Sequence, residues 1–210
     1  MYKRNRYTTA IKILLIAVSF ISCPLHHATG NEKSPAYFYF KQLSGRDGLS
    51  SNFVRDIMLD YNGFFWFGTR AGLSRFDMHD FRNYYSVPDS VSSLPDDYIQ
   101  FIFEDGTKKI WVSTQRGLCR YNKETDTFTP VTHGGKILQA RSYMFVEGGI
   151  IFGGAQGTIY KYDYTRAELA QVPLKWDTPT THYINYVSRW KKGTWIISSR
   201  WDGIWTVDTV

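Results

Sequence analysis

The side chains that could catalyse a reaction or hold a metal ion are few and scattered. Three histidines lie beyond the amino-terminal 30 residues, with no ligand spacing between them: His79, His133 and His182. Asp96-Asp97 and Glu104-Asp105 are carboxylate pairs that a glycosidase could use, but the second pair precedes a glycine at an expected turn, where Asp forms local hydrogen bonds. The chain has no nucleophile elbow, phosphate loop or zinc-protease motif. We therefore expect no catalytic residue, no metal site and no cofactor.

Binding chemistry is better represented. Planar polar side chains beside aromatic rings suit sugars, because they hydrogen-bond hydroxyl groups while a ring covers the apolar face. Ten candidate ligand-binding residues fall in expected loops, either near Ser51 and Asp96, before inner strands, or between second and third strands: Asn52, Arg70, Asp97, Tyr98, Gln115, Arg116, Gln156, Arg200, Trp201 and Asp202. Arg200-Trp201-Asp202 is the best candidate, because an exposed tryptophan in a loop needs a reason. The alternative for each residue is a solvated rim without a ligand.

The elements that must position these residues follow from an internal repeat. The segment Leu49–Asp77 aligns without a gap on Leu94–Asn122, at an offset of 45 residues. Eight positions are identical, where about two are expected by chance. Trp66 matches Trp111 in this alignment, and both are expected to fill the space between sheets. A repeat of about 40–45 residues with short apolar strands is typical of a β-propeller blade.

Two looser copies follow the first two. Ile151–Gly157 stands where Trp111–Gly117 stood, and Ile196–Gly203 repeats the pattern again with one inserted residue. We therefore predict an all-β protein, a β-propeller of about four four-stranded antiparallel blades. In the first blade the four strands are expected, in order from the inside, at Val54–Leu59, Phe64–Thr69, Leu73–Phe76 and Phe81–Tyr85. In a propeller, the loops that enter inner strands and those that join second to third strands share one rim, where the candidate residues lie.

The two ends of the repeat array leave its closure open. Tyr37–Leu43 resembles an outer strand with no blade before it, and the array ends on Ile204–Val207, a third strand. The first segment could complete the last blade, which would close a ring of four blades, the lower limit for propellers. The alternative is that these residues form the front of a longer propeller, with open edges that are prone to aggregate.

The amino terminus is typical of an export signal. A basic stretch precedes the apolar segment Ile11–Ile21, which is too short to span a membrane, and Ala28-Thr29-Gly30 offers small residues for cleavage. We therefore expect a signal peptide over residues 1–30, one propeller domain over residues 31–210 and a periplasmic location. Cys23 leaves a lipid anchor open, although Pro24 follows it. Contact with a membrane is expected only through the signal or such an anchor.

The charge of the remaining chain argues against nucleic acid as a partner. Residues 31–210 hold 21 Lys and Arg against 19 Asp and Glu, a net charge of only +2. The basic character of the full chain therefore belongs to the export signal. Cys119, the one cysteine beyond that signal, is expected to be a small buried core residue.

The motifs of the first repeat, Leu43–Val54, Gly63–Thr69 and Gly72–Asp77, resemble the two-component regulator propeller repeat, and Ile102–Tyr121 matches the next copy. The resemblance is specific over Phe40–Val131 and looser to the end. The family builds the periplasmic sensor of hybrid two-component systems that regulate polysaccharide use in gut Bacteroidetes. Its rings are larger, which favours an open or partial propeller here. No kinase, receiver or DNA-binding segment is recognised within the 210 residues.

The resemblance implies the amino-terminal part of a carbohydrate sensor that is not itself an enzyme. Its expected partner is an oligosaccharide or a similar polar ligand, and a homodimer stays open. Two alternatives remain. One is a propeller enzyme acting on polysaccharide, which would need two carboxylates about 5–10 Å apart at the channel mouth. The other is a surface lipoprotein that serves as an interaction scaffold.

Overall fold

The computed structural model describes residues 39–174 and 183–208. The chain divides into two compact units, Met1–Lys41, of which residues 39–41 are described, and Gln42–Val210. The expected signal peptide, His182, and the first two residues of the Tyr37–Leu43 segment lie outside the described residues. All elements described below belong to the second unit.

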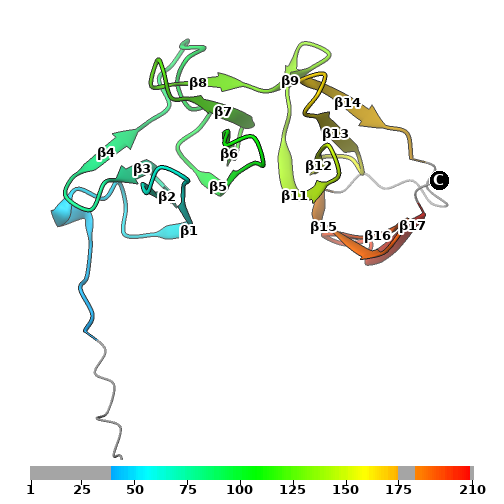
Figure 1. Ribbon diagram of the computed structural model, residues 1–210, viewed down its shortest axis with the longest axis horizontal. Coiled ribbons are helices and arrows are strands. Elements are labelled where there is room, and N and C mark those ends of the chain that lie inside the picture. Colours follow the sequence, from blue (N-terminus) through cyan, green and yellow to red (C-terminus); the bar gives the residue numbers. More distant parts are fainter. Residues whose placement is uncertain (1–38, 175–182, 209–210) are drawn as a thin grey trace, which may run out of the picture. The chain divides into compact units, whose positions relative to one another are not determined.

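The described chain is built from strands, with one short 3₁₀ helix, η1 (Gly45–Asp47), and no α-helix (Figure 1). Two consecutive antiparallel sheets of four strands come first. The first sheet contains β1 (Val54–Leu59), β2 (Phe65–Thr69), β3 (Gly72–Phe76) and β4 (Phe81–Tyr84). The second contains β5 (Ile99–Glu104), β6 (Ile110–Thr114), β7 (Leu118–Asn122) and β8 (Thr127–Pro130).

Three further sheets follow in chain order. A two-stranded ribbon, β9 (Thr132–His133) and β10 (Lys136–Ile137), precedes the third main sheet. That sheet contains β11 (Ala140–Val146), β12 (Gly149–Gly154), β13 (Ile159–Asp163) and β14 (Glu168–Val172). The fourth main sheet contains β15 (Ile184–Lys191), β16 (Thr194–Ser199) and β17 (Ile204–Asp208).

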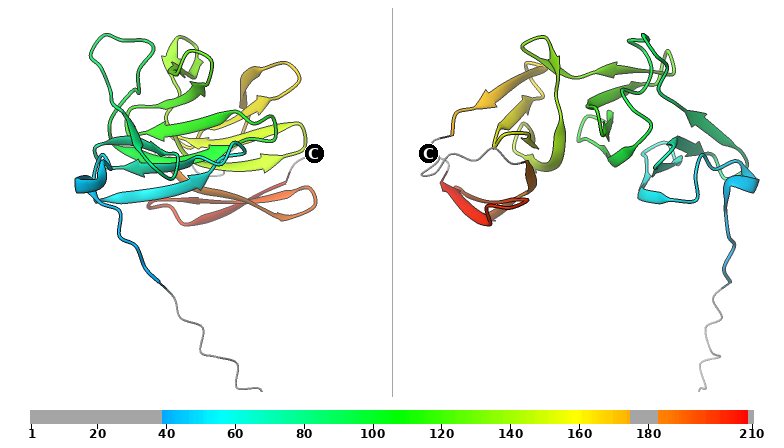
Figure 2. Two further views of the ribbon diagram at one scale, coloured as in Figure 1. Left: turned by 60° about the vertical axis from the view of Figure 1, so that its left-hand side comes forward. Right: turned by 180° about the vertical axis from the view of Figure 1, so that it is seen from behind.

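The four main sheets are copies of one unit, as the repeat predicted. Each innermost strand pairs with the second strand and carries a register shift at the same place, after Val54, Ile99, Ala140 or Ile184. Met58 faces Trp66 across the first pair, and Phe103 faces Trp111 across the second, as the gapless alignment requires. The expected all-β architecture of antiparallel blades is confirmed (Figure 2).

The core lies between consecutive sheets. Three clusters of buried side chains fill the successive interfaces, and fully buried members include Trp66 in the first, Trp111 in the second and Ile197 in the third. Burial of such aromatic side chains supplies much of the stability of an interface. Cys119 is buried in the first cluster, as expected for a core thiol.

Three expectations about the strands need correction. The fourth sheet has three strands, not four, among the described residues. Residues 39–43 form no strand, and Tyr39 and Phe40 are almost fully exposed, so the alternating aromatic pattern of Tyr37–Leu43 did not indicate an outer strand there. The ribbon β9–β10 was not anticipated from the sequence.

Candidate functional site

The order of the strands sets two ends for every sheet. In an antiparallel meander the β2–β3 and β6–β7 connections lie at the same end as the segments that enter the next innermost strand. We call this end the loop rim; it carries the ten candidate ligand-binding residues. The β1–β2, β5–β6 and β7–β8 connections lie at the opposite end, which we call the hairpin rim.

At the loop rim the structure brings Arg70 and Tyr98 together. The guanidinium carbon of Arg70 lies 4.1 Å from the ring centroid of Phe53 and 5.8 Å from that of Tyr98. Arg55, on β1, donates from Nη1 to the Tyr98 hydroxyl over 2.7 Å. We call Phe53, Arg55, Arg70 and Tyr98 the arginine–aromatic cluster. It holds two cations and two rings at a surface where half of the Phe53 side chain is exposed.

The backbone around Tyr98 is fixed by neighbours that the sequence also singled out. Asp96 Oδ1 accepts a hydrogen bond from the Tyr98 amide over 2.8 Å, and Asp96 Oδ2 lies 3.4 Å from Arg116 Nε. The Gln115 amide donates to the Tyr98 carbonyl over 2.9 Å. An ion pair as exposed as Asp96–Arg116 adds little stability. Its effect here is to orient the loop that carries the Tyr98 ring.

Two other candidates use their side-chain oxygens to hold loops. Asn52 Oδ1 accepts from the Gly45 amide over 2.7 Å, which anchors η1. Asp97 Oδ1 accepts from the Ser86 amide over 2.6 Å, and the Asp97 carbonyl accepts from Gly72. These contacts place both residues in the frame of the rim, and their role toward a ligand stays a prediction.

The remaining candidates lie on the third and fourth sheets. Gln156 is exposed in the β12–β13 connection, with φ of 54°. Trp201 is 71% exposed in the β16–β17 connection, and the Arg200 guanidinium lies 5.3 Å from its ring centroid. Asp202 shapes the same turn, because its Oδ2 accepts from the Ser199 hydroxyl over 2.9 Å. The exposed tryptophan that the sequence predicted is therefore present.

Sequence reasoning missed Phe53 and Arg55 as members of the cluster. Arg55 lies inside the expected inner strand Val54–Leu59, whereas the candidates were taken from expected loops; the burial of β1 alternates, with every second residue exposed. The alignment of Phe53 with Tyr98 was a usable signal, because it put an aromatic ring at the same rim position of both repeats.

The hairpin rim holds a cavity of about 430 Å³ between the first two sheets. None of the ten candidates lines it. Its ionisable lining residues are five cations and two acids, with aromatic and amide groups between them: Arg75, Lys108, Lys109, Arg120, Lys123, Asp60 and Glu124. The volume falls within the range of pockets for small ligands.

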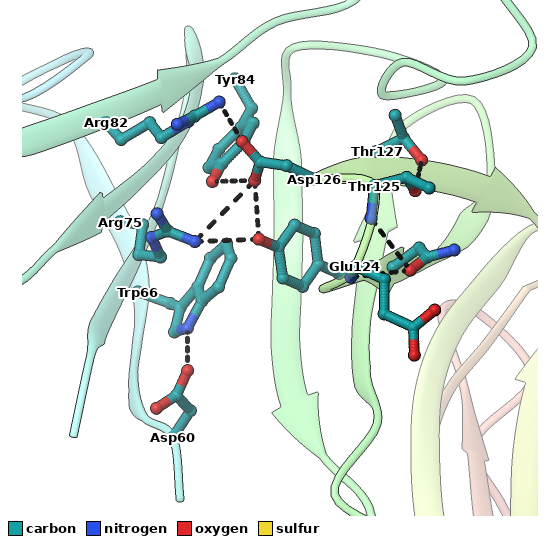
Figure 3. Close-up of polar contacts among 11 residues, drawn as sticks. Asp60, Trp66, Arg75, Arg82, Tyr84, Glu124, Thr125, Asp126 and Thr127 are labelled. Atoms are coloured by element: carbon teal, nitrogen blue, oxygen red, sulfur yellow. Dashed lines mark hydrogen bonds and ion pairs between the residues drawn. The ribbon is translucent and has the colours of Figure 1, made fainter. Parts of the chain in front are cut away.

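Four of the lining residues, Asp60, Trp66, Arg75 and Tyr121, form a polar framework, whose contacts are drawn in Figure 3. Asp60 Oδ2 accepts from Trp66 Nε1 over 2.8 Å, and Arg75 Nη1 donates to the Tyr121 hydroxyl over 2.8 Å. The Trp66 and Tyr121 rings meet edge to face at 4.9 Å. This Asp–Trp–Arg–Tyr framework recurs at the next interface, where Asp105 binds Trp111 and Arg120 donates to Tyr162.

Asp126 joins the first two sheets beside this framework. Its Oδ1 accepts from the hydroxyls of Tyr84 and Tyr121, and its carboxylate pairs with Arg82 and Arg75 (Figure 3). Burial raises the pKa of the carboxyl, but the two tyrosine hydrogen bonds and the two arginine charges outweigh burial and hold the pKa below its usual value. Burial and the bond to Asp126 raise the pKa of both tyrosines.

The carboxylate pairs considered for catalysis have structural tasks. Asp105 accepts from Trp111 Nε1 over 2.7 Å and from two amides of its own turn. Glu104 Oε2 accepts from the Tyr61 amide, which ties the first two hairpins together. Over the described ranges there is no cluster of three or more His, Cys, Asp or Glu residues suited to a metal ion. The same ranges contain no helix with the length and apolar character needed to cross a bilayer.

Comparison with known sequences gives two matches. Residues 48–71, which run from the end of η1 to the β2–β3 connection, match the family model described as two component regulator propeller. A histidine kinase of Formosa agariphila is 38% identical over 80 residues, which cover 38% of this chain and 5% of that protein. The chain therefore spans a small part of the curated relative that it matches.

Comparison with solved structures agrees on the fold. The extracellular domain of a hybrid two-component system from B. thetaiotaomicron superposes with a TM-score of 0.65 at 24% identity, over 80% of this chain and 25% of that one. A second such domain from the same organism gives 0.58 at 18% identity, over 75% and 21%. A computationally designed protein gives 0.52 at 14% identity, over 82% and 100%. The sheets described above are thus blades of a β-propeller.

Proposed function

Because this chain carries the two-component regulator propeller repeat, we propose that it is part of the extracellular sensor of a hybrid two-component system and that it binds carbohydrate without catalysis. Two kinds of similarity support this proposal. The matched relative is a histidine kinase, and two structures of similar fold are extracellular domains of such systems. In this proposal the sensor domain lies in the periplasm, which agrees with the export signal expected at residues 1–30.

The single observation that carries the binding proposal is the arginine–aromatic cluster. Arg70 and Arg55 present guanidinium donors at the loop rim, and both lie against the faces of aromatic rings. Guanidinium groups donate to sugar hydroxyls or carboxylates, while the exposed side of Phe53 offers apolar surface. Because the cluster draws residues from two successive blades, both blades can contact the same ligand.

Trp201 supplies a second aromatic surface at the loop rim of the fourth sheet. A ring that is 71% exposed can cover the apolar face of a sugar, and Arg200 beside it can donate to hydroxyl groups. In this proposal the cluster on the first two blades and the tryptophan on the fourth contact different units of one oligosaccharide.

The proposal is tested by isothermal titration of the full chain with a panel of neutral and acidic oligosaccharides. Arg70→Ala and Trp201→Ala should each weaken binding by about 1–3 kcal/mol, the scale of a lost aromatic or charged contact. Arg166→Ala is the matched control, because Arg166 is an exposed arginine at the hairpin rim. Circular dichroism checks that each variant is folded.

Two outcomes would contradict the proposal. If folded Arg70→Ala and Trp201→Ala proteins bind as tightly as the parent, the loop rim is not the site. If no member of the panel binds while the full-length sensor responds to one of them, carbohydrate recognition resides elsewhere in the sensor.

A further inference from the structure

The turns at the hairpin rim share one backbone conformation. In each of the four main sheets, one residue in the connection between the first and second strands has positive φ: Gly63 (88°), Lys108 (65°), Gly148 (71°) and Gly193 (78°). Side chains with a Cβ adopt this region at a cost, and glycine does not. Three copies use glycine, so the turn itself does not require the lysine at 108. The lysine is therefore particular to the second blade.

Lys108 is one of five cationic residues that line the 430 Å³ cavity between the first two sheets. Lys109 follows it in the same turn, and Lys123 reaches the cavity from the β7–β8 hairpin. Arg75 and Arg120 line the walls. This one cavity therefore gathers five cations in a domain whose acids and bases nearly balance.

Arg75 is paired with Asp126, but the acids that line the cavity do not neutralise the three lysines. Asp60 is buried and accepts three hydrogen bonds, from Trp66 Nε1 and from the amides of Asn62 and Phe64. The Asp60 carboxylate is thus engaged by these three donors and not by a lysine of the cavity. Within the described part of the chain no ion pair involves a lysine. Lys123 Nζ donates to the neutral amide oxygen of Asn62 over 2.9 Å, so its full charge remains at the cavity.

The next interface shows that the fold does not need these lysines. Both interfaces share the Asp–Trp–Arg–Tyr framework. At the positions of Lys108 and Lys109, three and two residues before the framework tryptophan, the third sheet has Gly148 and Gly149. At the position of Lys123, two residues after the framework tyrosine, it has Tyr164, which packs against the core. The positive charge is therefore an addition to the first interface.

We propose that this cavity is a second binding site and that it takes a small multivalent oxyanion, an organic molecule or ion bearing carboxylate, sulfate or phosphate groups. The site is distinct from the arginine–aromatic cluster, because it opens at the opposite end of the sheets. Lys108, Lys109 and Lys123 supply ammonium groups from two hairpins, and charge-assisted hydrogen bonds to oxyanions are the strongest that such groups form. Both hairpins belong to the second blade, and Arg75 on the cavity wall extends the site to the first blade.

The test measures the melting temperature and the titration heat of the full chain with citrate and, separately, with sulfate. Both anions are used at low millimolar concentration against sodium chloride of equal ionic strength, so that general salt effects cancel. The parent chain should bind at least one probe saturably and melt at higher temperature with it. The comparison of citrate with sulfate separates carboxylate from sulfate recognition.

Three variants make the test specific. Lys108→Gly should raise the melting temperature without anion by about 1–4 °C, because it relieves the left-handed backbone, and should weaken binding by about tenfold. Glu124→Gln should strengthen binding, since it removes from the cavity a negative charge that repels the anion. Lys136→Ala, on β10 and outside the cavity, is the control and should change neither quantity.

The opposite results would overturn the proposal. Absence of saturable binding for both probes in the parent chain would do so directly. Equal affinity in the parent and in folded Lys108→Gly would show that the lysine is not part of a site. A lower melting temperature of Lys108→Gly with an unchanged anion response would make Lys108 a structural residue.

Discussion

Replacement of Trp66 by alanine is the sharpest test of how the blades are held together. Trp66 is fully buried at the first interface, where it contacts the rings of Tyr84 and Tyr121 and donates to Asp60. Removal of a buried tryptophan side chain costs about 3–5 kcal/mol through lost burial and the cavity left behind. The buried Asp60 oxygen also loses its partner, which costs about 1–3 kcal/mol more, not fully additive with the first loss.

The expected loss is therefore about 4–6 kcal/mol, a large part of the total stability of a typical domain. It corresponds to a fall in melting temperature of about 8–24 °C for a domain of this size. Urea unfolding followed by circular dichroism measures the free energy. Trp111→Ala should cost the same, because Trp111 is equally buried and donates to Asp105 over a similar distance. Trp201→Ala, at an exposed tryptophan, should change stability by less than about 0.5 kcal/mol.

The reasoning is refuted if the Trp66 and Trp201 variants differ by less than about 1 kcal/mol, which would mean that the space between the sheets is not a packed core. A large cost at Trp66 and a negligible one at Trp111 would refute the equivalence of the two interfaces, even if the fold itself is correct.

Four further predictions concern the same interfaces. Because the pKa of Asp126 is lowered in the folded chain, its contribution is present above the unfolded pKa of about 3.9 and lost as the pH falls through the folded value, so Asp126→Asn should flatten the acid side of a stability–pH curve. The pKa of Tyr84 is raised, so stability should decline as the pH rises above about 10, and less steeply in Tyr84→Phe. Gly68→Ala should destabilise by about 1–3 kcal/mol in urea unfolding, since the new Cβ would lie 2.7 Å from a side-chain carbon of the second sheet, and an unchanged midpoint would contradict that contact. Ile102→Ala should cost about 2–5 kcal/mol, whereas Ile57→Ala at the equivalent but 59% exposed position should cost under about 1 kcal/mol; equal costs would count against the described packing.

The repeat unit could be predicted closely because its spacing is set by pairing within one sheet. A gapless offset fixes which residue faces which, so the equivalent burial of Trp66 and Trp111 followed from the alignment alone. The weaker third and fourth copies were also placed correctly, because Gly153 and Ile197 keep the small or apolar character that the interface demands. Local pattern and tertiary packing agree at these positions.

The ends of the array and the site were harder to predict for a common reason. The alternating aromatics before Leu43 suit a strand, but strand formation depends on a partner, and the described residues there have none. The arginine–aromatic cluster depends on the approach of β1 to the loop before β5, which no local pattern specifies. The cavity at the hairpin rim needed three hairpins from two blades, so its lysines appeared in the sequence as unrelated surface charges.

The Asp–Trp–Arg–Tyr framework also sets how cooperatively the blades melt. It couples the first sheet to the second and the second to the third through directional hydrogen bonds. The third interface has Ile151 and Val207 at the positions of the tryptophan and tyrosine, so the framework is not repeated there. Apolar packing dominates, and the hydrogen bonds from Ser142 to the Ile184 carbonyl and from Tyr183 to Gln139 are long, at 3.4 Å each. In a linear array, stability is a sum of unit terms and nearest-neighbour terms, and the weakest link opens first. Amide hydrogens of β15–β17 should therefore exchange with solvent before those of β5–β8, which makes the fourth blade the element whose order a bound partner can change at the lowest energetic cost.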